Sequence, residues 1–378
     1  MRSALAGVAI LLVTALPAQA TPQRGVLFDG GSSYPRVIRL ANGTILASIT
    51  TNMGADGTGV ISASADNGRT FKRIATIKDP AGARGGGTCC STLYELPSAV
   101  GTLPAGTVLW VSTMGFSAPL GVRNTSNRLW ASTDRGVTWR FLSNVAVSPN
   151  RFDIWEPSLS VAADGRLVAF YSDETDKVHH DQKLVQVRSA DGVHWTDQRE
   201  TVVSADWYVR PGMINTLRLP DRSYFMTYEV CNNDLIHLCS AYFRRSADGW
   251  NYGDPRDLGT LVLTADGKHG RHTPTPAWSP RPGRAGTILL ITEMLVQDGG
   301  ATAGGNGGTI LANDNHGDGP WYEMPAPIKV SGVDNEGCRN FSPSLLPARD
   351  GRAVLEVTTD YDHAVCKTYY ATGPLSRF

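Results

Sequence analysis

The stretch STDRGVTW, residues 132–139, decides the fold because it recurs along the chain. SADNGRTF at 64–71 fits the same pattern, S-x-D-x-G-x-T followed by an aromatic residue. SADGVHW from Ser189 and SADGWNY from Ser246 are shorter versions, and NDNHGDGPW from Asn313 is a degenerate one. In such a stretch Asp accepts hydrogen bonds from turn amides, Gly takes a positive φ, and the aromatic ring packs back onto the sheet. Each copy therefore predicts a hairpin turn between two strands.

A longer repeat surrounds these turns. Each unit has a small or Pro-containing start, a hydrophobic strand, a turn rich in Gly, Asp or Asn, and a second hydrophobic strand. Six units, 56 to 67 residues apart, begin at Tyr34, Cys90, Glu156, Met213, Thr275 and Ser342. Six sheet repeats of this length predict a six-bladed β-propeller. The 40 glycines, the 22 prolines and the absence of a long helix-period run agree with an all-β fold.

The first 20 residues have the pattern of a secretory signal peptide. Arg2 supplies the positive charge, residues 4–16 are apolar, and Ala18-Gln19-Ala20 is a small-residue cleavage site. We therefore expect a secreted protein, extracellular or periplasmic, in which residues 21–378 form a single propeller domain. The apolar stretch is too short for a typical membrane span.

The charge balance bears on partners. The 35 basic and 35 acidic residues cancel, and no basic tract occurs, which argues against nucleic acid or an anionic membrane as a partner. We expect a monomer whose partner is an oligosaccharide or polysaccharide substrate. No CxxC or HExxH motif occurs, so we expect neither a metal nor a cofactor.

The six cysteines are an even number, which fits complete pairing in an exported protein. Fifteen connectivities are possible. Among them we expect Cys231–Cys239 and Cys338–Cys366, and a vicinal disulfide between Cys89 and Cys90.

Aligning the six units identifies the candidate catalytic residues. The position before the first strand holds Tyr34, Glu156, Met213 and Ser342, and the position late in the second strand holds Thr50, Thr113, Ser172, Glu229, Glu293 and Thr358. A glutamate in an apolar strand is costly unless it is paired or faces a solvated cavity. Glu229 therefore forms an ion pair across the axis or faces the central pocket. Two pocket carboxylates, one acid and one base or nucleophile, are what glycoside hydrolysis needs.

Other residues are candidates for substrate binding. Aromatic rings stack on sugar rings, and Trp155, Trp207, Tyr208 and Tyr361 are placed to do so, with blade packing as the alternative. Glu293 is a candidate for orienting sugar hydroxyls or holding an arginine. Basic side chains that an acidic pocket would attract are Arg36, Arg210, Arg271 and Arg339, with structural ion pairs as the alternative.

These residues resemble glycoside hydrolase family 93, the exo-α-1,5-L-arabinanases, and the repeated turn looks like the Asp box of the sialidase superfamily. The resemblance rests on Trp155-Glu156-Pro157 and Tyr228-Glu229, whose glutamates are 73 residues apart, and on CCSTLYELP, TPTPAWSPRPGRAGTILL and FSPSLLPARDGRAVL. It implies a retaining glycoside hydrolase that releases arabinobiose from arabinan through a covalent intermediate, without a metal.

The roles of the two glutamates follow from their neighbours. Trp155 would desolvate Glu156 and raise its pKa, as a general acid requires, whereas Glu229 lies deeper in its strand and suits a fixed nucleophile. One alternative is a sialidase, whose substrate-binding arginines would include Arg36 in the stretch YPRV. That alternative leaves Glu156 unexplained. Another is a non-catalytic carbohydrate-binding propeller, which would lack paired carboxylates in its pocket.

Overall fold

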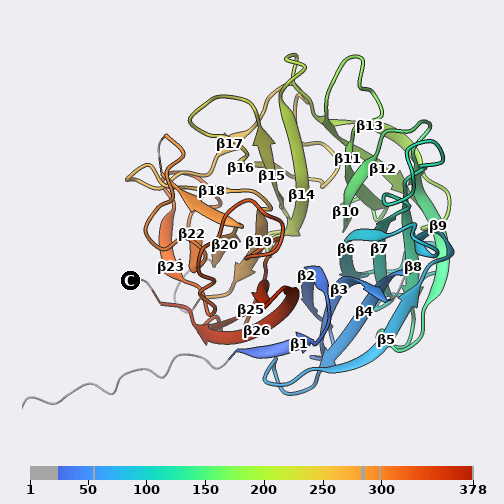
Figure 1. Cartoon of the computed structure of the whole chain (residues 1–378), viewed down its shortest axis with the longest axis horizontal. Coiled ribbons are helices and arrows are strands. Elements are labelled where there is room, and N and C mark those ends of the chain that lie inside the picture. Colours follow the sequence, from blue (N-terminus) through green and yellow to red (C-terminus); the bar gives the residue numbers. More distant parts are fainter. Residues whose placement is uncertain (1–23, 54–55, 282–285, 298, 377–378) are drawn as a thin grey trace, which may run out of the picture.

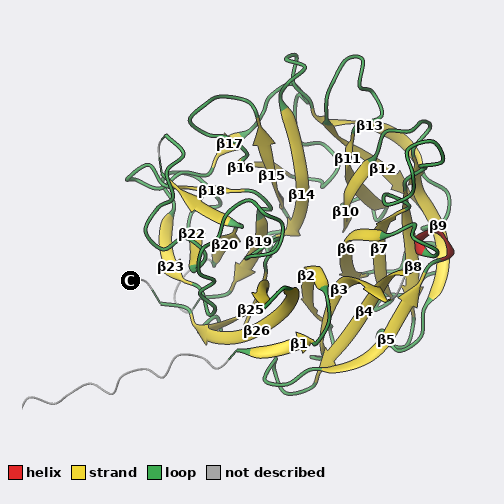
Figure 2. Ribbon diagram, in the orientation of Figure 1, coloured by secondary structure: helices red, strands yellow, loops and turns green. Residues whose placement is uncertain are grey.

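The structure is a computed structural model, which describes residues 24–53, 56–281, 286–297 and 299–376. The expected signal peptide, residues 1–20, lies outside the described residues. The prediction of an all-β, six-bladed propeller is confirmed. The described strands form six antiparallel sheets arranged around a central axis, as Figure 1 shows, and Figure 2 shows that strands and loops make up nearly all of the chain. Within the described part, no helix is long and apolar enough to span a membrane.

Three blades are regular four-stranded meanders, with the strand nearest the axis first in the chain. Blade 1 contains β2 (Ser32–Arg39), β3 (Ile45–Met53), β4 (Asp56–Ser64) and β5 (Lys72–Lys78). Blade 2 contains β6 (Thr88–Glu95), β7 (Val108–Met114), β8 (Ser126–Ser132) and β9 (Arg140–Val147), after the short 3-10 helix η1 (Pro80–Gly82). Blade 3 contains β10 (Ile154–Val161), β11 (Leu167–Asp173), β12 (Lys183–Ser189) and β13 (Thr196–Val202).

The other three blades depart from this pattern. Blade 4 contains β14 (Arg210–Arg218), β15 (Tyr224–Cys231) and β16 (Ser240–Ser246), extended by β17 (Thr260–Leu261), β18 (His269–Arg271) and β21 (Met294–Val296). Blade 5 contains β19 (Thr275–Ser279), β20 (Thr287–Ile291), β22 (Thr309–Asn313) and β23 (Tyr322–Pro325). Blade 6 contains β24 (Ser344–Pro347), β25 (Ala353–Asp362), β26 (Val365–Pro374) and β1 (Gly25–Phe28).

Blade 6 closes the ring. Its outermost strand, β1, comes from the other end of the described chain and pairs antiparallel with β26, for example Gly25 with Tyr370. Both ends of the propeller are therefore held in one sheet (Figure 1). This closure fixes how the first and last blades meet, and so the shape of the space at the axis.

The hydrophobic core is divided among the interfaces between blades. Leu109 and Leu129 of blade 2 pack in one cluster with Leu159 and Val187 of blade 3, and similar clusters join the other neighbouring blades. Burial of apolar surface stabilises a fold by about 25 cal/mol per Å². Because that burial lies between sheets, each blade depends on its neighbours for stability.

The repeated turns join the third strand of a blade to the outer one. In the blade 2 turn, Ser132 Oγ accepts from the Gly136 amide at 2.8 Å and donates to Asp134 Oδ1 at 2.8 Å. Asp134 also accepts from the amide and hydroxyl of Thr138, at 2.9 and 2.6 Å. Gly136 has φ +88°, as the pattern predicts. The bonds close within the turn, so the motif is structural.

The three predicted disulfides are all present, and among the described residues no cysteine is free. Cys338–Cys366 joins the segment before β24 to β26 within blade 6. Cys231–Cys239 closes the loop between β15 and β16. Cys89–Cys90 is the vicinal pair on β6. The last two lie beside the candidate site described next.

Candidate active site

Every blade places one residue in the left-handed region of φ at the start of its innermost strand. In blades 1 to 4 this residue sits in a β-bulge, where the register with the second strand shifts. The left-handed residues of the six blades, in order, are Tyr34, Cys90, Glu156, Met213, Thr273 and Ser342, with φ between 47° and 63°. Such values are uncommon for residues other than Gly and persist only where the surrounding structure holds them. A bulge of this kind re-aims a side chain.

Four of these residues, Tyr34, Cys90, Glu156 and Met213, line one pocket of about 390 Å³. Glu229 lines the same pocket. The remaining lining residues are Ser33, Cys89, Trp155, Glu174, Gln182, Arg210, Cys231 and Phe341. The two candidate catalytic glutamates, from consecutive blades, therefore share one pocket.

Glu156 lines the pocket from the start of β10. Its Oε2 accepts a hydrogen bond of 2.7 Å from the hydroxyl of Ser172, which lies late in the second strand of the same blade. Burial raises the pKa of Glu156 to about 7, the Ser172 hydrogen bond opposes that rise, and the negative charge of Glu229 adds to it. A carboxyl group that keeps its proton near neutral pH can serve as a general acid.

Glu229 is held differently. It pairs with Gly212 across β14 and β15, and is 8% exposed. Its Oε2 accepts from the Thr273 amide at 3.1 Å and lies 3.3 Å from His272 Nδ1. Its Oε1 lies 3.6 Å from Cys231 Sγ, which carries no hydrogen because it is disulfide-bonded. One carboxylate oxygen thus accepts a hydrogen bond from the Thr273 amide and contacts His272, while the other accepts no hydrogen bond from the described residues.

Gly212 explains how Glu229 comes so close to blade 3. A Cβ at this position would lie 2.3 Å from the Gln182 amide nitrogen and 3.6 Å from Ser172 Oγ. Gln182 in turn donates to the Pro211 carbonyl at 3.0 Å. The missing side chain therefore lets the innermost strand of blade 4 pack against the polar groups of blade 3.

Glu293 lies beside this site but outside the pocket lining. It follows β20, is fully buried, and both of its carboxyl oxygens lack a hydrogen-bond partner among the described residues. Burial and the nearby charge of Glu229 raise its pKa to about 8, against a smaller opposite effect of Arg271. A buried carboxyl without donors is most stable when protonated. Its role as a binder of sugar hydroxyls stays a prediction.

The expected aromatic residues are divided between the pocket and its surroundings. Trp155 lines the pocket, and its ring lies 5.7 Å from that of Phe116. Trp207 and Tyr208 are exposed and contact each other edge-to-face at 5.1 Å on the loop before β14, outside the pocket lining. Tyr361 lies in β25, also outside that lining, with the Arg339 guanidinium 5.2 Å from its ring.

The arginines are mostly engaged in structural contacts. Arg36 is buried, donates to the Ser342 carbonyl and hydroxyl at 3.1 and 3.0 Å, and lies over the Tyr34 ring. The positive charge of Arg36 therefore makes contacts inside the fold, whereas a sialidase would need it to bind the carboxylate of its substrate.

Arg210 lines the pocket wall and donates to Glu174 and Gln182, at 2.6 and 2.7 Å, and to Asp181. These bonds make it a rigid part of the wall.

Three side chains around His272 could in principle ligate a metal. The donor atoms of Cys231, Cys239 and His272 lie within 4.8 Å of one another. The two cysteines are joined as a disulfide, and a thioether-like disulfide sulfur lacks the thiolate charge that soft metals require. The donor set as it stands therefore does not fit a metal.

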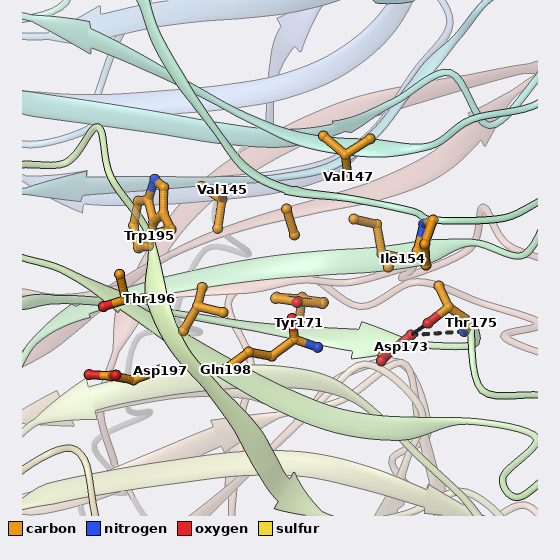
Figure 3. Close-up of a pocket in the computed structure, with 13 residues that line it drawn as sticks. Val145, Val147, Ile154, Tyr171, Asp173, Thr175, Trp195, Thr196, Asp197 and Gln198 are labelled. Atoms are coloured by element: carbon orange, nitrogen blue, oxygen red, sulfur yellow. Dashed lines mark hydrogen bonds between the residues drawn. The ribbon is translucent and has the colours of Figure 1, made fainter.

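A second cavity, of about 410 Å³, lies between blades 2 and 3 (Figure 3). Tyr171 and Asp173 of β11 point into it in Figure 3, together with Trp195. Asp173 accepts from the amide and hydroxyl of Thr175, at 2.8 and 2.6 Å, and Asp197 pairs with Arg188 at 2.6 Å. Because its carboxylates are occupied in this way, this cavity has no acid and nucleophile pair.

Sequence reasoning missed His272 and Thr273. The alignment of the repeats starts the fifth unit at Thr275, whereas the structure places Thr273 at the left-handed position and Thr275 in β19. The alignment also places Glu293 late in the second strand, but β20 ends at Ile291. His272 lies in the long insertion between β16 and β19, which carries no repeat signal. It is therefore identified only by its contact with Glu229 in the structure.

The comparisons with known proteins agree with this architecture. No protein-family model and no curated protein matches the chain. The α-L-arabinanase of Penicillium chrysogenum, solved with arabinobiose, has 25% sequence identity and a TM-score of 0.78, over 95% of this chain and 99% of its own. The GH93 α-L-arabinofuranosidase of Fusarium graminearum, also solved with arabinobiose, has 25% identity and a TM-score of 0.76, over 93% and 97%.

A more distant similarity shows the fold alone. The NanB sialidase of Streptococcus pneumoniae has 10% identity and a TM-score of 0.61, over 94% of this chain and 71% of its own. The two arabinan-related structures, by contrast, match this chain over nearly the full length of both partners. The resemblance to glycoside hydrolase family 93 seen in the sequence is therefore confirmed, and the chain has the architecture of a glycoside hydrolase of that family.

Proposed function

We propose that the protein is a retaining exo-hydrolase of α-1,5-linked arabinan that releases arabinobiose, with Glu156 as acid/base and Glu229 as nucleophile. One observation carries the proposal: the two glutamates share a pocket, where burial raises the pKa of Glu156 to about 7 and the Thr273 amide donates to Glu229 Oε2. Glycoside hydrolysis with retention needs such a pair of pocket carboxyl groups, one as acid/base and one as nucleophile. The arabinobiose complexes of the two similar structures support the choice of substrate.

In the first step, the protonated Glu156 carboxyl gives its proton to the glycosidic oxygen of the departing arabinan chain. Glu229 attacks the anomeric carbon, the bond to the leaving oxygen breaks, and a glycosyl ester forms on Glu229. The free oxygen Oε1 is the one available for attack, because Oε2 is bound by the Thr273 amide.

In the second step, Glu156 acts as a base. It takes a proton from a water molecule, whose oxygen attacks the anomeric carbon and breaks the ester to Glu229. Glu156 is protonated again and Glu229 is again a carboxylate, so both groups return to their starting states. Two inversions at one carbon leave the product with the configuration of the substrate.

The pocket walls support binding of a sugar. Trp155 and Tyr34 offer aromatic surface, and Met213 and the Cys89–Cys90 pair offer apolar surface beside them. Pockets for small ligands combine such surfaces with a few fixed polar groups. Trp207 and Tyr208, exposed on the next loop, are proposed to contact the polymer outside the pocket.

The test is an assay on linear α-1,5-arabinan, with a fluorogenic sialoside as the competing substrate. We expect arabinobiose from the arabinan, formed with retention of configuration as seen by proton NMR. Activity on the sialoside alone would exclude the proposal.

Variants separate the two roles. Glu156→Ala should lose most activity and regain turnover with azide, which needs no base, whereas Glu229→Ala should be inactive on all substrates. Glu356→Gln is the matched control, because Glu356 is equally buried but lies in β25 and bonds to the Ile328 amide at 2.7 Å. A loss in the control equal to that in Glu229→Ala would refute the assignment.

Export through the segment 1–20 remains part of the proposal. The three disulfides fit an oxidising environment. Detection of the mature chain, beginning near Thr21, in culture medium or periplasm would test it.

A further inference from the structure

Two neighbouring residues hold one oxygen of Glu229, and both have unusual backbone conformations. His272 has φ +60° and Thr273 has φ +50°, and both contact Glu229 Oε2 through the imidazole Nδ1 and the backbone amide. A left-handed residue other than Gly is uncommon, and a β-branched one is a genuine outlier. Thr273 also precedes Pro274, which restricts its backbone further.

Hydrogen bonds on every side hold this segment in place. The His272 amide donates to the Cys239 carbonyl at 3.0 Å, and the His272 carbonyl accepts from the Glu293 amide at 3.1 Å. The Thr273 hydroxyl accepts from the Ser342 amide at 3.2 Å. Strained conformations persist where the surroundings over-determine them, and they cluster at functional sites.

A disulfide links Glu229 to His272 through a continuous series of bonds and contacts. Glu229 precedes Cys231 by two residues, Cys231 is bonded to Cys239, and the Cys239 carbonyl accepts from the amide of His272. The His272 ring then returns to Glu229 Oε2 at 3.3 Å. The position of the imidazole relative to the carboxylate is therefore set by covalent and backbone bonds.

The His272 imidazole contacts the Glu229 carboxylate through Nδ1. His272 is 9% exposed, and its Nε2 is buried without a hydrogen-bond partner among the described residues. A proton on Nδ1 meets the carboxylate, whereas a proton on Nε2 would be buried without an acceptor. The tautomer with its hydrogen on Nδ1 is the one that fits the site.

We propose that His272 is a positioning residue for Glu229: its Nδ1–H, together with the Thr273 amide, orients the carboxylate and leaves Oε1 to react. This inference rests on the proposed function. It adds a residue from the segment after β18 to a site otherwise formed by the inner strands.

Other charged groups act on Glu229 as well. Glu156 of β10, Glu293 after β20 and Tyr34 of β2 are electrostatically coupled to it, and Arg271 of β18 lies near Glu293. Amid these charged groups, the Thr273 amide and His272 Nδ1 both contact the carboxylate oxygen Oε2 of Glu229.

The test uses variants that separate the ring donor from the backbone. Asn tolerates the left-handed conformation, and its amide nitrogen lies near the position of Nδ1. Gly accepts the conformation without a donor, and Gln places its donor near the position of Nε2. We expect His272→Asn to keep most of the activity, and His272→Gly and His272→Gln to lose about 10- to 100-fold in kcat with little change in KM.

His316 provides the matched control. It is a histidine with φ +53° on a turn of blade 5, paired with Asp221 at 3.5 Å. His316→Asn and His316→Gly make the same changes away from the pocket and should leave kcat unchanged. Equal losses in both series would show a general backbone effect and overturn the proposal.

The ¹³C NMR signal of the Glu229 carboxyl supplies a readout that a purely structural role would not move. Loss of the donor should change its chemical shift in His272→Gln and leave it near the wild-type value in His272→Asn, with the signal assigned by Glu229→Gln. If His272→Gln matches His272→Asn in kcat and in this chemical shift, the inference is wrong.

The NMR comparison also separates the two proposals. A wild-type protein that does not cleave arabinan would refute the proposed substrate. The difference in the chemical shift of the Glu229 carboxyl between the Asn and Gln variants would still decide the role of His272, because this measurement needs no substrate and does not depend on His272→Gly folding.

Discussion

Replacing Ser172 by Ala should move the basic limb of the pH–rate profile to higher pH. The Ser172 hydroxyl donates to Glu156 Oε2 at 2.7 Å, and this hydrogen bond opposes the burial that raises the pKa of Glu156 to about 7. A donor to the carboxylate stabilises the ionised form. Its removal should raise the pKa further, so that Glu156 keeps its proton to higher pH.

The size of the shift follows from the strength of the bond. A hydrogen bond to a charged group contributes about 1.5–3 kcal/mol, and one pKa unit corresponds to about 1.36 kcal/mol. A hydroxyl can rotate and also bond to the protonated carboxyl, so only part of this energy discriminates between the two forms. We expect a shift of about 0.5–1 unit. At pH 8 the fraction of Glu156 that is protonated then rises from about one tenth to between about one quarter and about one half.

The assay is kcat/KM on linear arabino-oligosaccharides from pH 4 to pH 9. Thr113→Ala is the control, because Thr113 has the same ring position in blade 2 but donates to Asn127 Oδ1 at 2.8 Å instead of a carboxylate. Its profile should keep the wild-type limbs. A basic limb that stays in place or moves down in a folded Ser172→Ala protein would refute the view that this limb reports Glu156.

Three further predictions concern stability and binding. Burial raises the pKa of Glu356 to about 8, so the folded state keeps a proton that the unfolded chain loses above about pH 4.5, and stability falls as pH rises between these values. Between pH 5 and pH 8, the unfolding free energy of Glu356→Gln, measured in urea, should fall by about 3 kcal/mol less than that of the wild type. If the unfolding free energies of the two proteins fall in parallel with pH, this prediction is wrong. Asp134→Ala should lower the unfolding free energy by about 1–2 kcal/mol without changing kcat, because it removes the bonds to Thr138; unchanged urea midpoints would count against a structural turn. Arg210→Met should raise KM, and this rise should exceed the fall in kcat by a factor of about five to ten, because the substitution removes the bond to Glu174 in the pocket wall. A loss confined to kcat would instead indicate that Arg210 acts in the chemical step.

Much of the fold could be predicted because each blade repeats a local pattern. The turn from Ser132 to Trp139 closes its hydrogen bonds within eight residues, so its sequence suffices to recognise it. The alignment then compares like positions, which is why Glu156, Glu229 and Glu293 stand out from the Tyr, Met, Thr and Ser of other blades. The same local reasoning supports the disulfide between Cys231 and Cys239, eight residues apart.

Contacts between blades were less predictable. Arg36 looks like a pocket residue in the sequence, but the closed ring places Ser342 of blade 6 beside its guanidinium. Trp207 and Tyr208 stand next to Arg210 in sequence, yet only Arg210 lines the pocket, because the chain turns into β14 between them.

The disulfides were one expected pairing among fifteen, which the structure confirmed. The sequence by itself determined the six-fold repeat, the turns and the exceptional glutamates, because each depends on residues close in the chain or on comparison of equivalent positions. The tertiary structure alone decided how those glutamates differ. Thr273 reaches Glu229 across 44 residues, and Glu156 meets the charge of Glu229 from another blade. Burial, donor contacts and the left-handed bulges arise only when the blades close into a ring, so the raised pKa of Glu156 and the contact of Glu229 with Thr273 are properties of the tertiary structure.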